Sequence, residues 1–129
     1  MEKEEKELFK KYPKILNRKN LPWKLECNKG WFKLIDNLCE YVQEQTDQNP
    51  HIYKGQTEAT QIKEKFGGLR FYVNGTHSDF LAAIQYVEFL SYKICEFCGK
   101  DGKLQNNNGW YKTTCGKCPG FKKWDKRWG

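Results

Sequence analysis

The spacing of apolar residues predicts three helices, over residues 3–12, 30–45 and 78–94. In each segment apolar side chains recur every three or four positions, which is the period of an amphipathic helix. Pro13 ends the first helix because proline cannot continue the backbone hydrogen-bond ladder. Ser78 or Thr76 is suited to cap the third helix, since a hydroxyl can accept a free backbone N–H group of the first turn.

Alternating apolar and polar residues predict a β-hairpin over residues 61–74, which follows a polar loop at 46–60. A turn at Gly67-Gly68 fits a two-residue hairpin loop, because glycine accepts positive φ angles without strain. One face then pairs Phe66 with Leu69, Glu64 with Phe71 and Ile62 with Val73, and the other carries Lys63, Lys65, Arg70 and Tyr72.

Glu64 interrupts the apolar face of this hairpin. A carboxylate there must be paired, protonated or turned outward, because an isolated charge is costly to bury. A β-bulge or an ion pair with Arg70 satisfies that need, and a functional carboxylate is the other interpretation.

Two Cys-x-x-Cys pairs, Cys95/Cys98 and Cys115/Cys118, carry the clearest chemistry of the chain. Two such pairs can supply the four thiolates of a tetrahedral zinc site. Redox motifs of this type occur as one copy, whereas these two copies flank an Asn-Gly hairpin signal at 108–109. Four thiolates leave no open position for water, so we expect one structural Zn²⁺ in a zinc ribbon over 95–118.

These elements predict an α+β fold in which three helices pack on the β-hairpin. The core spans 1–94, the zinc ribbon spans 95–118, and a basic aromatic tail occupies 119–129. The third predicted helix runs directly into Cys95, so we expect the ribbon to be docked on the core.

The chain has a formal net charge of +7, and its positive charge lies toward the two ends. The segments 1–24, 25–92 and 93–129 carry +4, −3 and +6. An anionic partner is therefore expected to meet the zinc ribbon or the tail. The candidate ligand-binding residues are Lys63, Lys65, Arg70, Tyr72, Trp110, Lys112, Trp124, Lys126 and Arg127, which combine positive charge with stacking surfaces. The aromatic residues of the tail can equally anchor it on its own domain.

The start of the chain carries Glu2, Glu4 and Glu5 where a secretory signal needs a basic and then an apolar segment. No apolar run approaches the ~20 residues of a membrane span. Reduced thiols for zinc agree with a cytoplasmic location. Cys27 and Cys39 are interpreted as small buried hydrophobic residues.

Catalytic motifs do not fit the chain. A zinc deaminase needs His-x-Glu and Pro-Cys-x-x-Cys, but here the candidate is His77-Ser-Asp79 and proline is missing before Cys95. Neither a nucleophile elbow nor a phosphate-binding glycine loop occurs. We therefore expect no enzymatic activity.

Three stretches together resemble a group of small phage and prophage proteins, most of them hypothetical. They are the hairpin motif at 62–72, the first cysteine pair within 94–100, and Gly-Trp-Tyr-Lys-Thr at 109–113. Cys118 departs from that group, in which the second pair often ends in histidine. The resemblance implies a phage protein in the host cell cytoplasm and no defined activity.

The function predicted from this combination is a non-enzymatic binding protein that counteracts host immunity. It would sequester a nucleotide signal or block a host defence protein. The alternative is a zinc-ribbon protein that binds DNA or RNA. The sequence leaves the oligomeric state open, with a homodimer among the options.

Overall fold

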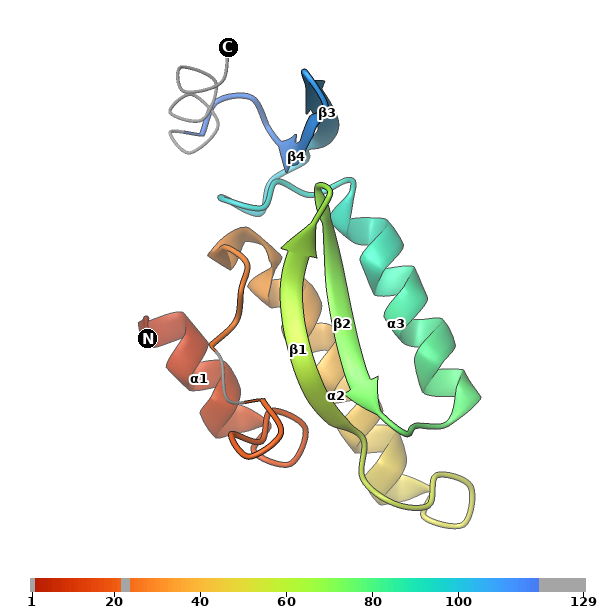
Figure 1. Ribbon diagram of the computed structural model, residues 1–129. Coiled ribbons are helices and arrows are strands. Elements are labelled where there is room, and N and C mark those ends of the chain that lie inside the picture. The colour runs from red at the N-terminus through yellow and green to blue at the C-terminus, as the bar shows by residue number, and fades with distance from the viewer. Residues whose placement is uncertain (1, 22–23, 119–129) are drawn as a thin grey trace.

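The computed structural model describes residues 2–21 and 24–118, and these form an α+β fold (Figure 1). The predicted fold class is confirmed. In chain order the elements are α1 (Lys3–Lys11), the 3-10 turn η1 (Lys29–Trp31), α2 (Phe32–Gln48), β1 (Glu58–Lys65), β2 (Gly68–Asn74), α3 (Ser78–Ser91), β3 (Lys103–Asn107) and β4 (Trp110–Thr114).

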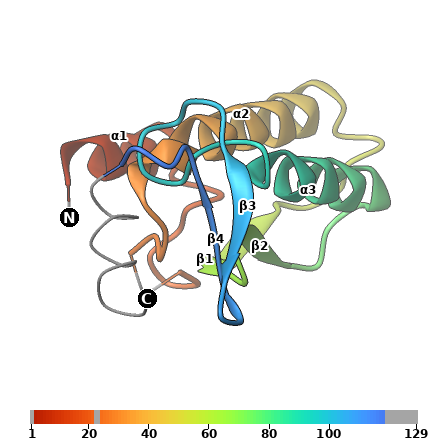
Figure 2. The ribbon, with the colours of Figure 1, turned by 90° about the horizontal axis from the view of Figure 1, so that it is seen from above.

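The strands form two antiparallel hairpins, β1 with β2 and β3 with β4. Figures 1 and 2 show α2 and α3 on the same side of the first hairpin, and α3 contacts both β2 and α2. The side chains between these layers are apolar, and Trp31, Ile35 and Leu69 are fully buried there. The predicted helices each match an observed one, although α2 continues to Gln48, which shortens the predicted loop, and α3 ends at Ser91 rather than at residue 94. The cap of α3 is His77 instead of a hydroxyl residue, since its Nδ1 accepts from the backbone N–H of Asp79.

The turn of the first hairpin differs from the prediction. The chain turns at Phe66 and Gly67, both with positive φ (53° and 85°), and Lys65 pairs with Gly68. The predicted cross-strand pairs are therefore wrong, since Glu64 faces Leu69 and Ile62 faces Phe71. Gly68 is needed inside β2, because a Cβ at this position would overlap the ring of Tyr92.

The two faces of the hairpin are nevertheless those that the alternation predicts, because the pairing shifts by an even number of residues. Ile62, Leu69 and Phe71 point into the core. Phe66 is the exception: it was expected on the apolar face, but it lies in the turn and is 63% exposed.

Both outer edges of this hairpin are occupied. Along β1, the backbone of Glu26 forms two hydrogen bonds of 2.9 and 3.0 Å. Along β2, α3 supplies the acceptors: Ser91 Oγ accepts from Leu69 N–H and Glu88 Oε2 accepts from Phe71 N–H, both at 2.9 Å. A third strand from another chain would have to displace these contacts, so strand addition at either edge is disfavoured.

The N-terminal helix α1 is attached to the core by polar contacts as well as by burial of Leu8. Tyr12 donates its O–H to Asp36 of α2, and Lys11 Nζ lies 3.1 Å from the same carboxylate. Within the described residues, no helix has the length and apolar character that a membrane crossing requires.

Candidate metal centre

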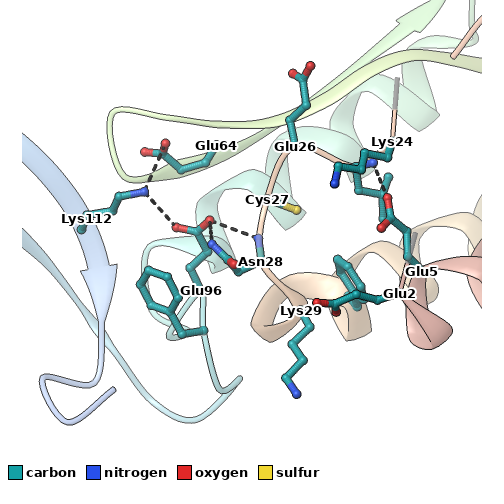
Figure 3. A pocket seen from close by; sticks show the side chains of 13 residues that line it. Glu2, Glu5, Lys24, Glu26, Cys27, Asn28, Lys29, Glu64, Glu96 and Lys112 are labelled. Carbon is teal, nitrogen blue, oxygen red and sulfur yellow. Dashed lines mark hydrogen bonds and ion pairs between the residues drawn. The ribbon is translucent and has the colours of Figure 1, made fainter. Parts of the chain in front are cut away.

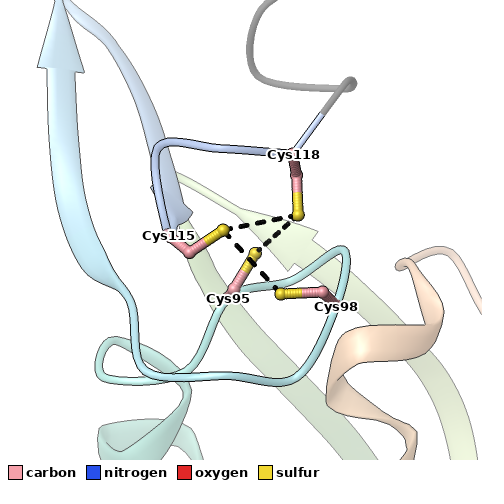
Figure 4. A group of neighbouring side chains, drawn as sticks. All are labelled: Cys95, Cys98, Cys115 and Cys118. Carbon is pink, nitrogen blue, oxygen red and sulfur yellow. Dashed lines mark hydrogen bonds between the residues drawn. The ribbon is translucent and has the colours of Figure 1, made fainter.

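The first cysteine pair lies in a tight turn that follows α3. Cys95 N–H donates to Lys100 O at 2.7 Å, and Gly99 N–H donates to Cys95 O at 3.0 Å. Gly99 has a φ of 81°, a conformation that side chains with a Cβ rarely adopt. This turn brings the thiols of Cys95 and Cys98 to the same side of the loop (Figure 4).

The second pair is delivered by the hairpin of β3 and β4, which turns at Asn108 and Gly109 with positive φ at both residues. This is the Asn-Gly turn that the sequence predicts. After β4, Gly116 N–H donates to Thr114 Oγ1 at 3.0 Å, and the chain bends so that Cys115 and Cys118 face the first pair.

The four sulfur atoms form one compact cluster, and all lie within 4.8 Å of one another. Cys95 Sγ is 3.6 Å from Cys118 Sγ, which is 3.4 Å from Cys115 Sγ, and Cys98 Sγ is 3.8 Å from Cys115 Sγ. Cys95 and Cys118 are buried, whereas Cys98 is exposed. The cluster can therefore hold a metal ion, with four protein ligands around it.

Backbone N–H groups favour the thiolate form of Cys95 and Cys115, whereas burial and hydrogen bonds with the neighbouring thiols raise the pKa of Cys118. Burial raises the pKa of the Cys95 thiol, but hydrogen bonds from the backbone of Cys98, Cys115 and Phe97 outweigh it and lower the pKa to about 6. The backbone N–H of Lys117 likewise lowers the pKa of Cys115. Thiolates are the form that binds metal, so these contacts suit the cluster to that role.

Glu96, inside the first cysteine pair, joins the metal centre to the core (Figure 3). Its side chain is 1% exposed. Oε2 accepts from the backbone N–H and the side-chain Nδ2 of Asn28 at 3.1 and 3.0 Å, and Oε1 lies 3.4 Å from Lys112 Nζ. A buried carboxylate with these partners fixes the position of the loop relative to the core.

The backbone around Glu96 fits closely against the 3-10 turn η1. Gly30 N–H donates to Glu96 O at 2.7 Å, and a Cβ at Gly30 would overlap the backbone of Cys95 and Glu96. Beside it, Trp31 Nε1–H donates to Ile94 O at 2.8 Å. The region that carries the cysteines is thus docked on the core.

Glu64 is paired, but its partners are not those predicted. Its Oε2 accepts from Gly67 N–H at 2.7 Å, and its Oε1 lies 3.4 Å from Lys112 Nζ. No bulge occurs at this position, because the only register shift in the β1–β2 pairing of the described strands lies between Ala59 and Gln61. Arg70 instead donates to Leu69 O and to the Tyr92 hydroxyl.

A cavity of about 700 Å³ lies beside Glu96, between α1, the chain at 24–29 and the ribbon (Figure 3). No sequence motif marks this cavity, since its residues come from distant segments. Its lining carries more carboxylates than lysines, so its charge disfavours an anionic ligand. The charged residues that line it are Glu2, Glu5, Glu26, Glu64, Glu96, Lys24, Lys29 and Lys112.

The predicted ligand-binding residues are only partly brought together. Lys63 and Arg70 are direct cross-strand partners on the outer face of the first hairpin, where Lys65 and Tyr72 also lie. Lys112 is separate from them, because its ammonium group lies between Glu64 and Glu96 and its side chain is 18% exposed. Trp110 lies on the ribbon and is 46% exposed; Trp124, Lys126 and Arg127 lie outside the described residues.

The two remaining cysteines do not join the metal cluster. Cys39 is fully buried in the core, and Cys27 is half-buried against it. Burial raises the pKa of both thiols, so both stay protonated at neutral pH. Their packing agrees with the interpretation as small hydrophobic residues.

Comparison of the chain with protein-family models, with curated proteins and with solved structures finds no match in any of the three.

Proposed function

We propose that the metal is zinc and that its role is structural. Zn²⁺ binds four thiolates as a tetrahedron with Zn–S bonds of about 2.3 Å, which places the sulfurs roughly 3.8 Å apart. The sulfur separations of 3.4, 3.6 and 3.8 Å are close to that edge length. Native mass spectrometry should find one zinc per chain that is lost under denaturing conditions. A different metal, or none in protein purified without chelator, would contradict the assignment.

We propose that the protein as a whole is a non-enzymatic binding protein. Four thiolate ligands would leave the zinc no position at which to activate water. We assign the ligand-binding surface to the outer face of the first hairpin. The residues that define this face are Lys63, Lys65, Arg70 and Tyr72. The observation that supports it most is the direct pairing of Lys63 with Arg70 on the face opposite the core.

The ligand class that fits this face best is a single strand of nucleic acid. Lys65 is exposed, and Tyr72 and Phe66 are 41% and 63% exposed, so cations and aromatic rings lie on one open surface. Phosphates pair with such cations, and bases stack on such rings. The cavity beside Glu96 is rich in carboxylates and suits a compact anionic nucleotide less well.

The alternative is a protein of phage origin that acts in the host cytoplasm against host defence, by sequestering a nucleotide signal or blocking a defence protein. Its support is the resemblance of the stretches at 62–72, 94–100 and 109–113 to small phage and prophage proteins. Experiments can distinguish nucleic-acid binding from sequestration of a nucleotide signal. A nucleotide signal would saturate one site, whereas the affinity for a strand should depend on strand length.

Fluorescence anisotropy with labelled single-stranded RNA and DNA of increasing length tests the proposal. Affinity should rise with strand length and fall steeply with added salt, because each phosphate contact releases counterions. The variant Lys63→Glu/Lys65→Glu should weaken binding by at least about tenfold and flatten the salt dependence.

Lys10→Glu/Lys14→Glu is the matched control, because it makes the same change in net charge at two exposed lysines near α1. Equal weakening by both variants would show that only net charge matters and would contradict the assignment to the hairpin face. Two outcomes would favour the alternative. One is saturable binding of a cyclic dinucleotide without binding of strands, and the other is binding of neither ligand.

A further inference from the structure

The solvent side of α3 carries an apolar stripe. The helix packs Phe80 and Ile84 into the core, yet it also leaves Tyr86 and Phe89 61% and 54% exposed. Their rings stack on each other, with centroids 6.2 Å apart and planes 24° apart. Large aromatic side chains gathered on one side of a helix are typical of an interaction surface.

The outer stripe has the spacing of a helix–helix seam. Within α3, Asp79, Ala82, Tyr86 and Phe89 are all exposed and follow one another at intervals of three, four and three residues. Lys93 is also exposed and follows Phe89 by four residues, in the turn just past the end of the helix at Ser91. This is the a/d spacing by which one helix lies along another. Its middle is apolar, and its two ends carry opposite charges.

These charges indicate what covers the stripe. We propose that a second copy of this chain packs on it, with the two α3 helices antiparallel about a two-fold axis near Tyr86. Tyr86 is seven residues from Asp79 and seven from Lys93. Antiparallel packing therefore brings Asp79 of each copy near Lys93 of the other, whereas parallel packing would place like charges together.

Both ends of the stripe are held in place by neighbouring groups. Tyr53 O–H donates to Asp79 Oδ2 at 2.9 Å, and His77 Nδ1 accepts from the backbone N–H of Asp79 at 3.0 Å. Lys93 Nζ lies over the Phe89 ring, 5.1 Å from its centroid. The charges are thus positioned before association, which lowers the entropic cost of pairing them.

The dimer is expected to be reversible. A helix of 14 residues is about 21 Å long, so one helix pair buries less than the roughly 800 Å² per partner of a standard interface. We expect a monomer–dimer equilibrium that shifts with concentration over the micromolar range. Zinc binding and the hairpin face take no part in it, so this inference is independent of the proposed function.

Sedimentation equilibrium of the zinc-loaded full chain over a concentration series tests the dimer. Phe89→Ser should raise the dimer dissociation constant at least about tenfold, because each dimer loses two apolar contacts. Ile52→Ser is the matched control, since it removes an apolar side chain that is 57% exposed in the loop after α2, and it should leave the constant unchanged. A wild-type protein that stays monomeric throughout would overturn the proposal.

Charge exchange tests the antiparallel arrangement itself. Asp79→Lys and Lys93→Asp should each weaken the dimer several-fold, because each creates two like-charge contacts. The double variant Asp79→Lys/Lys93→Asp should regain most of the wild-type affinity. Thermal unfolding of each variant confirms that it is folded. Single variants that leave the constant unchanged, or a double variant weaker than either single one, would overturn the arrangement.

Discussion

The core and the ribbon at 95–118 are stabilised by different forces. The core buries large apolar side chains, among them Trp31, Ile35 and Phe80. The ribbon has strands of five residues each. Its buried residues are two cysteines and three polar ones: Cys95, Cys118, Glu96, Thr113 and Thr114.

This contrast suggests how a segment as small as the ribbon can be ordered. A short hairpin without an apolar core is marginal in water, so the proposed zinc, bound by four thiolates, would supply the stability that burial does not. Polar contacts also join the two regions: Thr113 Oγ1 donates to Gly67 O at 2.6 Å, and Glu96 accepts from Asn28.

Loss of one metal ligand should have the largest effect. Cys98→Ser removes a thiolate from the proposed zinc site, and structural zinc sites contribute on the order of 10 kcal/mol of binding free energy in small zinc peptides. We expect zinc to be lost on purification and the ribbon to lose its structure, as measured by metal analysis and NMR. Cys27→Ala is the control and should keep its zinc, because Cys27 lies outside the cluster.

A cavity created in the core should destabilise the core and leave the zinc content of the ribbon unchanged. Ile35→Ala empties space at a fully buried position and should lower the free energy of unfolding by about 2–5 kcal/mol, as measured by urea denaturation. The zinc content of the folded variant should stay at one per chain. A folded variant that has lost its zinc would show that the two regions are not stabilised separately.

The junction between the regions should be sensitive at Gly30. Gly30→Ala forces a Cβ against the backbone of Cys95 and Glu96 and should cost about 1–3 kcal/mol in unfolding free energy. Gly75→Ala is the control, because a Cβ there meets nothing within 4 Å. Equal effects of the two substitutions would contradict the close fit at the junction.

Removal of the charge of Glu96 should have the smallest effect on the free energy of unfolding. Glu96→Gln keeps the shape of the side chain but weakens its charged contacts, at a cost of about 1–2 kcal/mol. A double-mutant cycle with Lys112→Met should show coupling between the two residues. Glu44→Gln, on the exposed side of α2, should be neutral. Additive effects at Glu96 and Lys112 would exclude their interaction.

Patterns within single segments predicted much of this structure. The helical spacing located α1, α2 and α3, and the cysteine spacing located the metal cluster. Contacts between distant segments were not predictable. Gly68 lies so close to the Tyr92 ring that a Cβ would overlap it, and the role of Glu96 depends on Asn28, which lies 68 residues earlier in the chain. Lys112 was chosen for its charge, but only the fold reveals the two carboxylates beside it.

Amide hydrogen exchange of the zinc-loaded protein, before and after removal of the metal by a chelator, tests whether the metal orders the ribbon while apolar burial orders the core. We expect amides of β3, β4 and the cysteine turns to lose their protection, while those of β1, β2, α2 and α3 keep most of theirs. Retained protection in the ribbon without metal, or equal loss in both regions, would contradict it.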